Sequence, residues 1–158
     1  MNLYKVNEIN NIIMNNIYFY SHIKGIYSAF SNFSNHPVTI NNKYYPTTEH
    51  YFQSQKFISE PEYMELIRVS ATPSIAKKLG SSRNHKLRED WNNVKEDIML
   101  IALRAKFTQH AELKQLLLST GDKILVEHTK NDKYWGDGGD GTGLNRLGHC
   151  LMIIRNEH

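Results

Sequence analysis

The chain contains very little cysteine and no long apolar segment. A single cysteine, Cys150, among 158 residues excludes an internal disulfide and agrees with a reducing compartment. The longest apolar run, Ile98 to Leu103, is far shorter than the roughly 20 residues that span a membrane as a helix. The first eight residues contain no apolar stretch of the kind that signal peptides carry. We therefore expect a cytoplasmic protein that does not enter a membrane.

The chain also lacks a large excess of charge of either sign. The formal net charge is only +3, which excludes a strongly basic nucleic-acid coat but allows a local anion-binding site. The eight histidines form no H-E-x-x-H or similar pair, so no metal site is expected. Cys150 lies in the apolar run 147–154 and is expected to be a buried core residue rather than a catalytic thiol.

The length and the local patterns predict a single α+β domain that is mostly helical. Residues 1–16 are polar and rich in asparagine, so we expect them to be loosely ordered, with one compact domain over 17–158. The expected strands are 17–20, 38–40, 43–45 and 123–128, the second and third joined by an Asn41-Asn42 turn. The expected helices begin at Pro46-Thr47-Thr48 and cover 61–69, 72–79, 94–107, 111–118 and 147–155.

The helix that follows Pro46 carries an unusual polar stripe. With Glu49 at zero on a helical wheel, Gln53 lies at about 40°, Lys56 at about −20° and Phe52 at about −60°. A surface helix of a soluble protein usually buries an apolar stripe instead. Two interpretations stay open: the stripe faces water, or it lines a pocket in which a carboxylate and an amine act on a polar ligand.

Two further segments allow a binding function. Residues 134–145 contain G-x-G-x-x-G at positions 136, 138 and 141, but no βαβ unit precedes it, so a dinucleotide site is not expected. The segment is either a flexible turn or a backbone that approaches a ligand closely. Residues 77–88 carry six basic side chains, which either are solvated or hold a phosphate.

Taken together, these segments resemble the NADAR family, in particular its YbiA-like branch. The matching strings include E-H-Y-F-Q-S-Q-K-F at 49–57, W-G-D-G-G at 135–139, F-S-N-F at 30–33, A-L-R-A-K-F at 102–107 and L-V-E-H-T at 125–129. The likeness runs from about Ile17 to Arg155, which is nearly the whole chain. One departure is notable: family members commonly carry arginine directly after the glycine at position 80, where this chain has Ser81.

The resemblance implies an N-glycosidase that hydrolyses the ribose C1′–N bond of phosphoribosylamino-pyrimidines, which are early intermediates of riboflavin synthesis. The products would be ribose 5-phosphate and an aminopyrimidine. The implied partner is this small molecule, no cofactor is implied, and nucleic acid enters only as an ADP-ribosylated substrate. Two alternatives remain: a glycohydrolase that removes ADP-ribose from guanine in nucleic acid, and a non-catalytic module that binds ADP-ribose or NAD.

The resemblance also implies roles for particular residues. Glu49, Lys56 and Asp137 are the expected catalytic residues: Glu49 would stabilise a cationic sugar, Lys56 could form a Schiff base at C1′, and Asp137 could position water. The expected substrate-binding residues are Tyr20, Ser31, Asn32, Phe33, Arg83, Arg88, Trp91, Trp135, Gly136, Gly138 and Asn145. Among them, Phe33 and Trp91 would stack on the base, and Arg83 or Arg88 would hold the 5′-phosphate.

Overall fold

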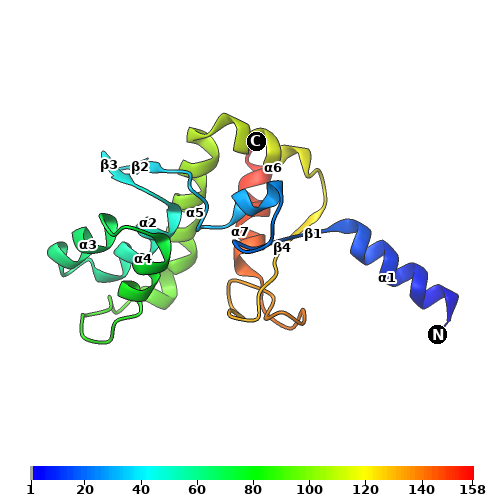
Figure 1. Cartoon of the computed structure of the whole chain (residues 1–158), viewed down its shortest axis with the longest axis horizontal. Coiled ribbons are helices and arrows are strands. Elements are labelled where there is room, and N and C mark those ends of the chain that lie inside the picture. The colour runs from blue at the N-terminus through cyan, green and yellow to red at the C-terminus, as the bar shows by residue number, and fades with distance from the viewer. Residues whose placement is uncertain (1) are drawn as a thin grey trace.

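The structure is a computed structural model that describes residues 2–158, apart from the side chains of 11–14. Its order of elements confirms a mostly helical α+β chain (Figure 1). The helices are α1 (Leu3–Asn15), η1 (Ile26–Phe30), α2 (Thr48–Ser54), η2 (Gln55–Phe57), α3 (Pro61–Arg68), α4 (Pro73–Gly80), α5 (Trp91–Gln109), α6 (Ala111–Ser119) and α7 (Arg146–Asn156), where η denotes a 3₁₀ helix. The strands are β1 (Asn16–Phe19), β2 (Val38–Ile40), β3 (Lys43–Tyr45) and β4 (Ile124–Glu127).

Local sequence explains the hairpin that precedes α2. Strands β2 and β3 pair antiparallel, with Val38 opposite Tyr45 and Ile40 opposite Lys43. Asn41 and Asn42 form the two-residue turn with φ of 52° and 62°. Asparagine tolerates this left-handed region better than most residues, so Asn-Asn serves where Asn-Gly is usual. The predicted hairpin is confirmed.

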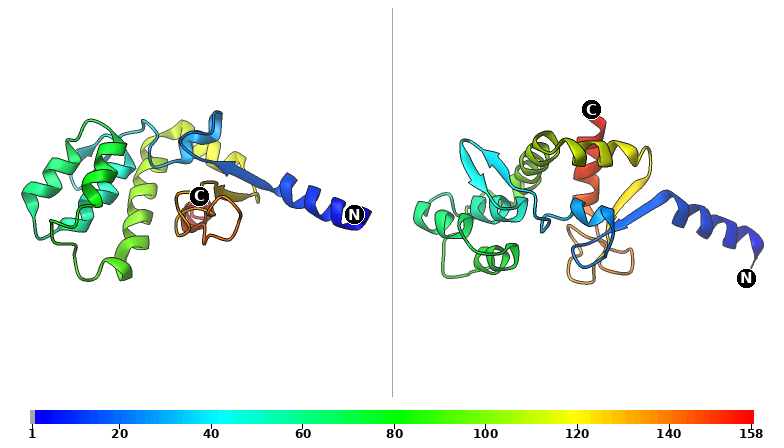
Figure 2. Two further views of the ribbon diagram at one scale, coloured as in Figure 1. Left: turned by 60° about the horizontal axis from the view of Figure 1, so that its bottom comes forward. Right: turned by 45° about the horizontal axis from the view of Figure 1, so that its top comes forward.

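Helix α2 begins as the sequence predicts but ends earlier. Thr47 is the N-cap, and its hydroxyl accepts a hydrogen bond from the His50 amide at 3.3 Å. The α-helix stops at Ser54 and tightens into the 3₁₀ helix η2, so the 3.6-residue wheel does not extend to Lys56. All seven residues of α2 are buried, because α3, α4 and α5 pack around it (Figure 2).

Helix α5 forms the spine of the core. Its buried face includes Met99, Leu103 and Phe107, and it packs on α7 on one side and on α2 on the other. Beside α7, β1 and β4 form a parallel pair with Ile17 opposite Leu125 and Phe19 opposite Glu127. The pairing joins two segments more than 100 residues apart in sequence, and no local pattern of residues predicts it. It brings the end of β4 close to the loop that follows β1.

The N-terminal segment is helical. Residues 3–15 form helix α1, and the Asn2 side chain caps it by accepting a hydrogen bond from the Tyr4 amide at 3.4 Å. That residues 1–16 are loosely ordered beside a domain over 17–158 stays a prediction. Met1 lies outside the described residues. The helix projects from the body, with Leu3 and Tyr4 largely exposed (Figure 1). No helix within residues 2–158 combines the length and the apolarity that crossing a membrane requires.

Candidate active site

A pocket of about 210 Å³ opens between α2, α4, the loop after η1 and the segment that follows β4. It is lined by Tyr20, Ser21, Ser31, Asn32, Phe33, Glu49, Phe52, Gln53, Lys56, Lys77, Ser81, Met99, Glu127, Thr129, Asn131, Asp132 and Trp135. Seven predicted site residues meet here, namely Tyr20, Ser31, Asn32, Phe33, Glu49, Lys56 and Trp135. The polar stripe of the sequence is therefore the wall of a pocket.

Glu49 is the buried carboxylate of the α2 wall, with only 6% of its surface exposed. One of its oxygens, Oε1, accepts a hydrogen bond from Gln53 Nε2 at 2.7 Å. Burial raises the pKa of Glu49, while this hydrogen bond and the charges of Lys77 and Lys56 act in the opposite direction. Gln53 Oε1 is buried and accepts no hydrogen bond within the described part of the chain. The wall therefore holds polar atoms whose hydrogen-bonding capacity is incompletely used.

Lys56 is positioned beside Glu49 by the 3₁₀ turn of η2. Its Nζ lies 3.3 Å from the carbonyl oxygen of Gly80, 5.6 Å from the ring centroid of Trp91 and 5.9 Å from that of Phe52. Desolvation by these neighbours lowers the pKa of Lys56, partly opposed by the charge of Glu49. A lowered pKa increases the fraction of neutral amine, which is the nucleophilic form of lysine.

The loop 31–33 forms the side of the pocket opposite α4. Asn32 Oδ1 accepts a hydrogen bond from Thr48 Oγ1 at 2.9 Å, and the Asn32 carbonyl accepts one from the Glu49 amide at 3.2 Å. These bonds tie the loop to the first turn of α2. Phe33 lies at the mouth, where Lys77 Nζ is 5.9 Å from its ring centroid.

Lys106 holds this loop from behind. It is 1% exposed, and its Nζ donates to the carbonyls of Ala29 (2.5 Å) and Ser31 (2.9 Å) and to Ser34 Oγ (2.7 Å). Burial lowers the pKa of Lys106 to about 7, whereas three acceptors around one ammonium group favour the charged form. The three acceptors hold the Lys106 Nζ group in place. The lysine therefore shapes the pocket without lining it.

The far side of the pocket holds acidic residues that the sequence analysis did not single out. Glu127 is the last residue of β4, and Asp132 follows in the next turn, where its Oδ1 accepts hydrogen bonds from the amides of Tyr134 and Trp135, both at 2.8 Å. Burial raises the pKa of Glu127 to about 8, and the nearby Asp132 and Glu49 carboxylates add to this effect. One sequence feature could have identified Glu127 as a site residue. It is the only carboxylate of the otherwise apolar strand β4, and it lies within the family-like string L-V-E-H-T.

Asp137 lies outside the pocket lining. Its Oδ2 is 2.7 Å from His128 Nδ1, and its Oδ1 accepts hydrogen bonds from the amides of Thr129 (3.1 Å) and Gly139 (2.8 Å). Burial raises the pKa of Asp137, but these hydrogen bonds more than offset it, so the pKa lies below its ordinary value. Asp137 therefore holds the glycine-rich loop through its hydrogen bonds, and its catalytic role stays a prediction.

The other predicted residues of the glycine-rich loop also serve its architecture. A Cβ on Gly136 would meet Thr129 Cγ2 at 2.7 Å and the Glu127 carbonyl oxygen at 3.0 Å. Gly138 has φ of 74°, and Asn145 has φ of 50°. The Asn145 side chain accepts from the Glu127 amide and donates to the Leu125 carbonyl, both at 2.9 Å. Gly136, Gly138 and Asn145 thus fix the end of β4 and do not line the pocket.

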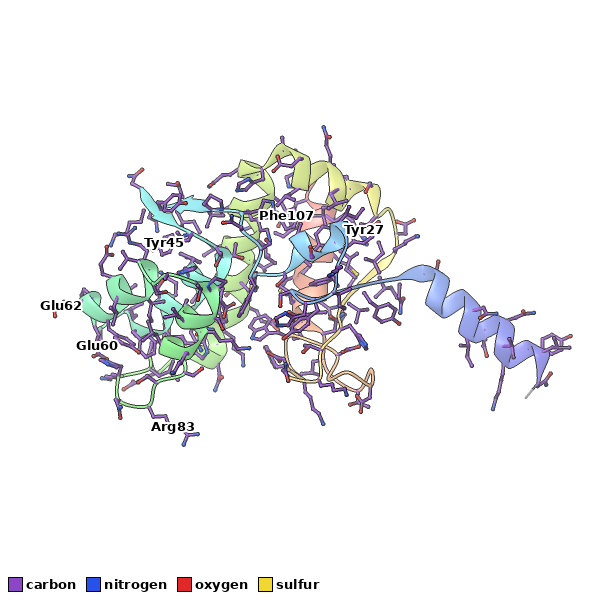
Figure 3. The ribbon with its side chains drawn as sticks, viewed as in Figure 1. Tyr27, Tyr45, Glu60, Glu62, Arg83 and Phe107 are labelled. Carbon is purple, nitrogen blue, oxygen red and sulfur yellow. The ribbon has the colours of Figure 1, made fainter. Side chains whose placement is uncertain are left out.

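Three predicted contacts from the 83–91 region also fall outside the pocket. Arg83 is exposed and extends away from the body at the tip of its loop (Figure 3). Arg88 pairs with Asp90 at 2.6 Å and donates to the Gln55 carbonyl at 3.4 Å. Trp91 is buried behind the pocket wall, with its ring centroid 5.1 Å from that of Phe52. Lys77 and Ser81 are the residues of this basic region that reach the pocket.

A known family matches most of the chain, including the segments that line the pocket. The family model described as the NADAR domain matches residues 18–157. The chain belongs to the NADAR family. This NADAR chain therefore matches its family over nearly all residues after α1, and the predicted family resemblance is confirmed. Among residues 2–158, no group of three or more His, Cys, Asp or Glu side chains is arranged to hold a metal ion.

Several named relatives share this NADAR domain. The chain is 53% identical over 131 residues to "N-glycosidase YbiA" of Escherichia coli (strain K12), covering 83% of this chain and 81% of the relative. It is 44% identical to an N-glycosidase of Nostoc punctiforme, covering 89% and 91%. It is 38% identical to a chloroplastic riboflavin biosynthesis protein of Zea mays, covering 84% of this chain and 23% of that protein. The NMR structure of E. coli YbiA matches with a TM-score of 0.83 and 52% identity, covering 90% of this chain and 84% of that one.

Proposed function

We propose that this protein is an N-glycosidase that hydrolyses the ribose C1′–N bond of phosphoribosylamino-pyrimidines and releases ribose 5-phosphate. The observation that carries the proposal is the placement of Glu49 and Lys56 on one pocket wall, with two aromatic rings behind the lysine. The names of the relatives, N-glycosidase and riboflavin biosynthesis protein, support both the reaction and the class of substrate.

Glu49 is suited to stabilise the reacting sugar. Breaking C1′–N develops positive charge on C1′ and on the ring oxygen, and a nearby carboxylate lowers the energy of that state. In a pocket from which most water is excluded, the attraction is stronger than at a surface. Gln53 fixes the carboxylate by donating to Oε1, so the second oxygen remains available to the substrate.

Lys56 allows a covalent route. A neutral amine could attack C1′ and form a Schiff base with the opened sugar, which water would then hydrolyse. The desolvation that lowers the pKa of Lys56 favours this form. In the alternative route, Lys56 remains charged and water attacks C1′ directly. The two routes differ in one observable, because only the first forms an adduct that borohydride traps.

The residues that line each side of the pocket suggest which part of the substrate they contact. Phe33 and Trp135 offer aromatic surfaces for the pyrimidine. Lys77 and Ser81 at the mouth suit the 5′-phosphate better than Arg83 or Arg88, because they line the pocket whereas the two arginines do not. No cofactor is part of this proposal, and the expected location is the cytoplasm.

The test is a comparison of substrates by mass spectrometry. Purified protein is incubated with a phosphoribosylamino-pyrimidine, with ADP-ribosylated DNA and with ADP-ribose, and released sugar phosphate is followed over time. The expected result is release of ribose 5-phosphate from the pyrimidine. Release of ADP-ribose from DNA alone would favour the guanine glycohydrolase, and calorimetric binding of ADP-ribose without any turnover would favour the binding module.

A further inference from the structure

Glu127 faces the same pocket as Glu49 from the opposite side, and its carboxyl has no role in holding the fold. The backbone of Glu127 is fixed at three points: β1 pairs with it, Asn145 Oδ1 accepts from its amide at 2.9 Å, and its carbonyl accepts from the Asp137 amide at 2.9 Å. None of the hydrogen bonds formed among residues 2–158 involves its carboxyl group. The fold therefore directs an unpartnered carboxyl group into the substrate pocket.

The charges around the pocket are divided unevenly between the two glutamates. Glu49 on α2 lies beside two cations, Lys56 on η2 and Lys77 on α4, accepts a hydrogen bond from Gln53, and has Asp132 as the one carboxylate that acts on it. Glu127 instead faces Asp132, Glu49 and, farther along the loop, Asp137, with Lys77 as the cation that acts on it. His128 points the other way and pairs with Asp137, and Tyr20 is the titratable group that the β1 side adds to the pocket.

Burial raises the pKa of both carboxyl groups, but their charged neighbours differ in sign. Burial penalises a charge in either position, but cations and a hydrogen bond favour an ionised Glu49, whereas carboxylates around Glu127 disfavour its ionisation. The pKa of Glu127 is raised to about 8, so near neutral pH it carries its proton. Acid and base roles in active sites are commonly separated by environments that differ in this way.

We infer that Glu127 is the general acid of this pocket and delivers its proton to the departing nitrogen of the aminopyrimidine. The inference rests on the proposed N-glycosidase function and adds to it the residue that protonates the leaving group. An amine departs poorly as an anion, so C–N cleavage requires a proton donor on the leaving-group side, whereas Glu49 stabilises the sugar.

The proposed step balances in protons and electrons. The C1′–N bond breaks, its electron pair remains on nitrogen, and that nitrogen takes the proton of Glu127, which becomes a carboxylate. C1′ forms a new bond to the oxygen of water, or first to Lys56 Nζ and then to water. The attacking water loses one proton on the way to the sugar hydroxyl, and that proton restores the Glu127 carboxylic acid.

The decisive experiment is the pH profile of kcat/KM for the wild type, Glu127→Gln and the control Glu112→Gln, an exposed glutamate at the start of α6. The wild type should lose activity as the pH rises through about 8, where Glu127 loses its proton. Glu127→Gln should be slower by about 10²- to 10⁴-fold at neutral pH and should lose this alkaline limb. Glu112→Gln should retain both the rate and the profile.

A second substrate separates proton donation from a structural effect. With 4-nitrophenyl riboside 5-phosphate the leaving group departs without a proton, so Glu127→Gln should be impaired far less than with the aminopyrimidine substrate. A Glu127→Gln variant that keeps its alkaline limb, or that loses the same factor on both substrates, overturns the inference and leaves the proposed function standing. A wild type that cleaves neither substrate overturns the proposed function, and this inference with it.

Discussion

The α2 wall of the pocket and the glycine-rich loop 136–145 both contain a buried carboxylate, but the two are used in opposite ways. Glu49 accepts one hydrogen bond and has a raised pKa, whereas Asp137 has both oxygens occupied and a lowered pKa. Saturated hydrogen bonding stabilises an ionised group and fixes its surroundings. A partly unsatisfied buried group is costly for stability and is available to a ligand. The contrast separates residues suited to chemistry from residues that hold the pocket together.

The largest expected effect is on activity, at the α2 wall. Glu49→Gln should lower kcat about 10²- to 10³-fold, by analogy with the removal of other groups that stabilise transition-state charge. The melting temperature should change little, because the carbonyl oxygen of a glutamine can accept the same hydrogen bond from Gln53 Nε2. Initial rates of ribose 5-phosphate release and thermal unfolding measure the two quantities. Near-normal turnover would remove Glu49 from the catalytic role.

Lys56→Met tests the covalent route at the same wall. With substrate and borohydride, the wild type should form a protein adduct whose mass increase matches the reduced sugar phosphate, and Lys56→Met should form none. Lys77→Met is the matched control at the pocket mouth, since it should weaken substrate binding yet still allow trapping at saturating substrate. An adduct that survives Lys56→Met would disprove the Schiff-base route through this residue.

In the glycine-rich loop the main effect should be on stability. Asp137→Ala leaves the buried amide of Thr129 and the half-buried amide of Gly139 without their acceptor, at a cost of about 1–3 kcal/mol for the buried group. Because the folded-state pKa is lowered, the stability from Asp137 is present above its unfolded pKa of about 3.9 and is lost as pH falls through the folded value. Asp137→Asn should therefore flatten the acid limb of stability against pH. Chemical denaturation from pH 2 to 7 measures the free energy of unfolding of each variant. A loss of kcat without a loss of stability would instead indicate a catalytic role for Asp137.

The buried lysine Lys106 extends the comparison to cations. Lys106→Met removes the donor of the Ala29 and Ser31 carbonyls and should destabilise the fold by about 1–3 kcal/mol. It should also raise KM, because the loop that carries Ser31, Asn32 and Phe33 loses its anchor. Lys123→Met, at an exposed position before β4, is the control for removing a lysine. Unchanged stability and KM in Lys106→Met would contradict the anchoring role.

The smallest effect is expected at Arg83. An exposed side chain without contacts to the pocket should change stability by no more than about 0.5 kcal/mol when replaced by alanine. KM should stay within about twofold, whereas Lys77→Ala should raise it about tenfold or more through the loss of a charge-assisted phosphate contact. Steady-state kinetics of the two variants compare them directly, and the reverse order would assign the phosphate to the arginine loop.

Local sequence predicted those parts of the molecule that depend on neighbours in the chain. The Asn41-Asn42 turn, the Thr47 cap and the helical periods of α5 and α7 follow from backbone preferences and apolar spacing, which act over a few residues. The family strings added the identity of Glu49 and Lys56 as site residues. The same strings also suggested Asp137. A motif indicates that a residue is important, but it does not distinguish a residue that contacts a ligand from one that stabilises a loop.

Only the tertiary structure decided which distant segments meet. The parallel pairing of β1 with β4 places Glu127 opposite Glu49, 78 positions earlier in the sequence, and no local preference encodes that approach. Burial and neighbouring charges then set each side chain's pKa and hydrogen-bonding capacity, which are properties of the assembled fold. The sequence by itself determined the helices that follow Pro46, the hairpin and the family. The assembled fold decided that Lys77 and Glu127 face the pocket while Asp137, Arg83 and Arg88 do not.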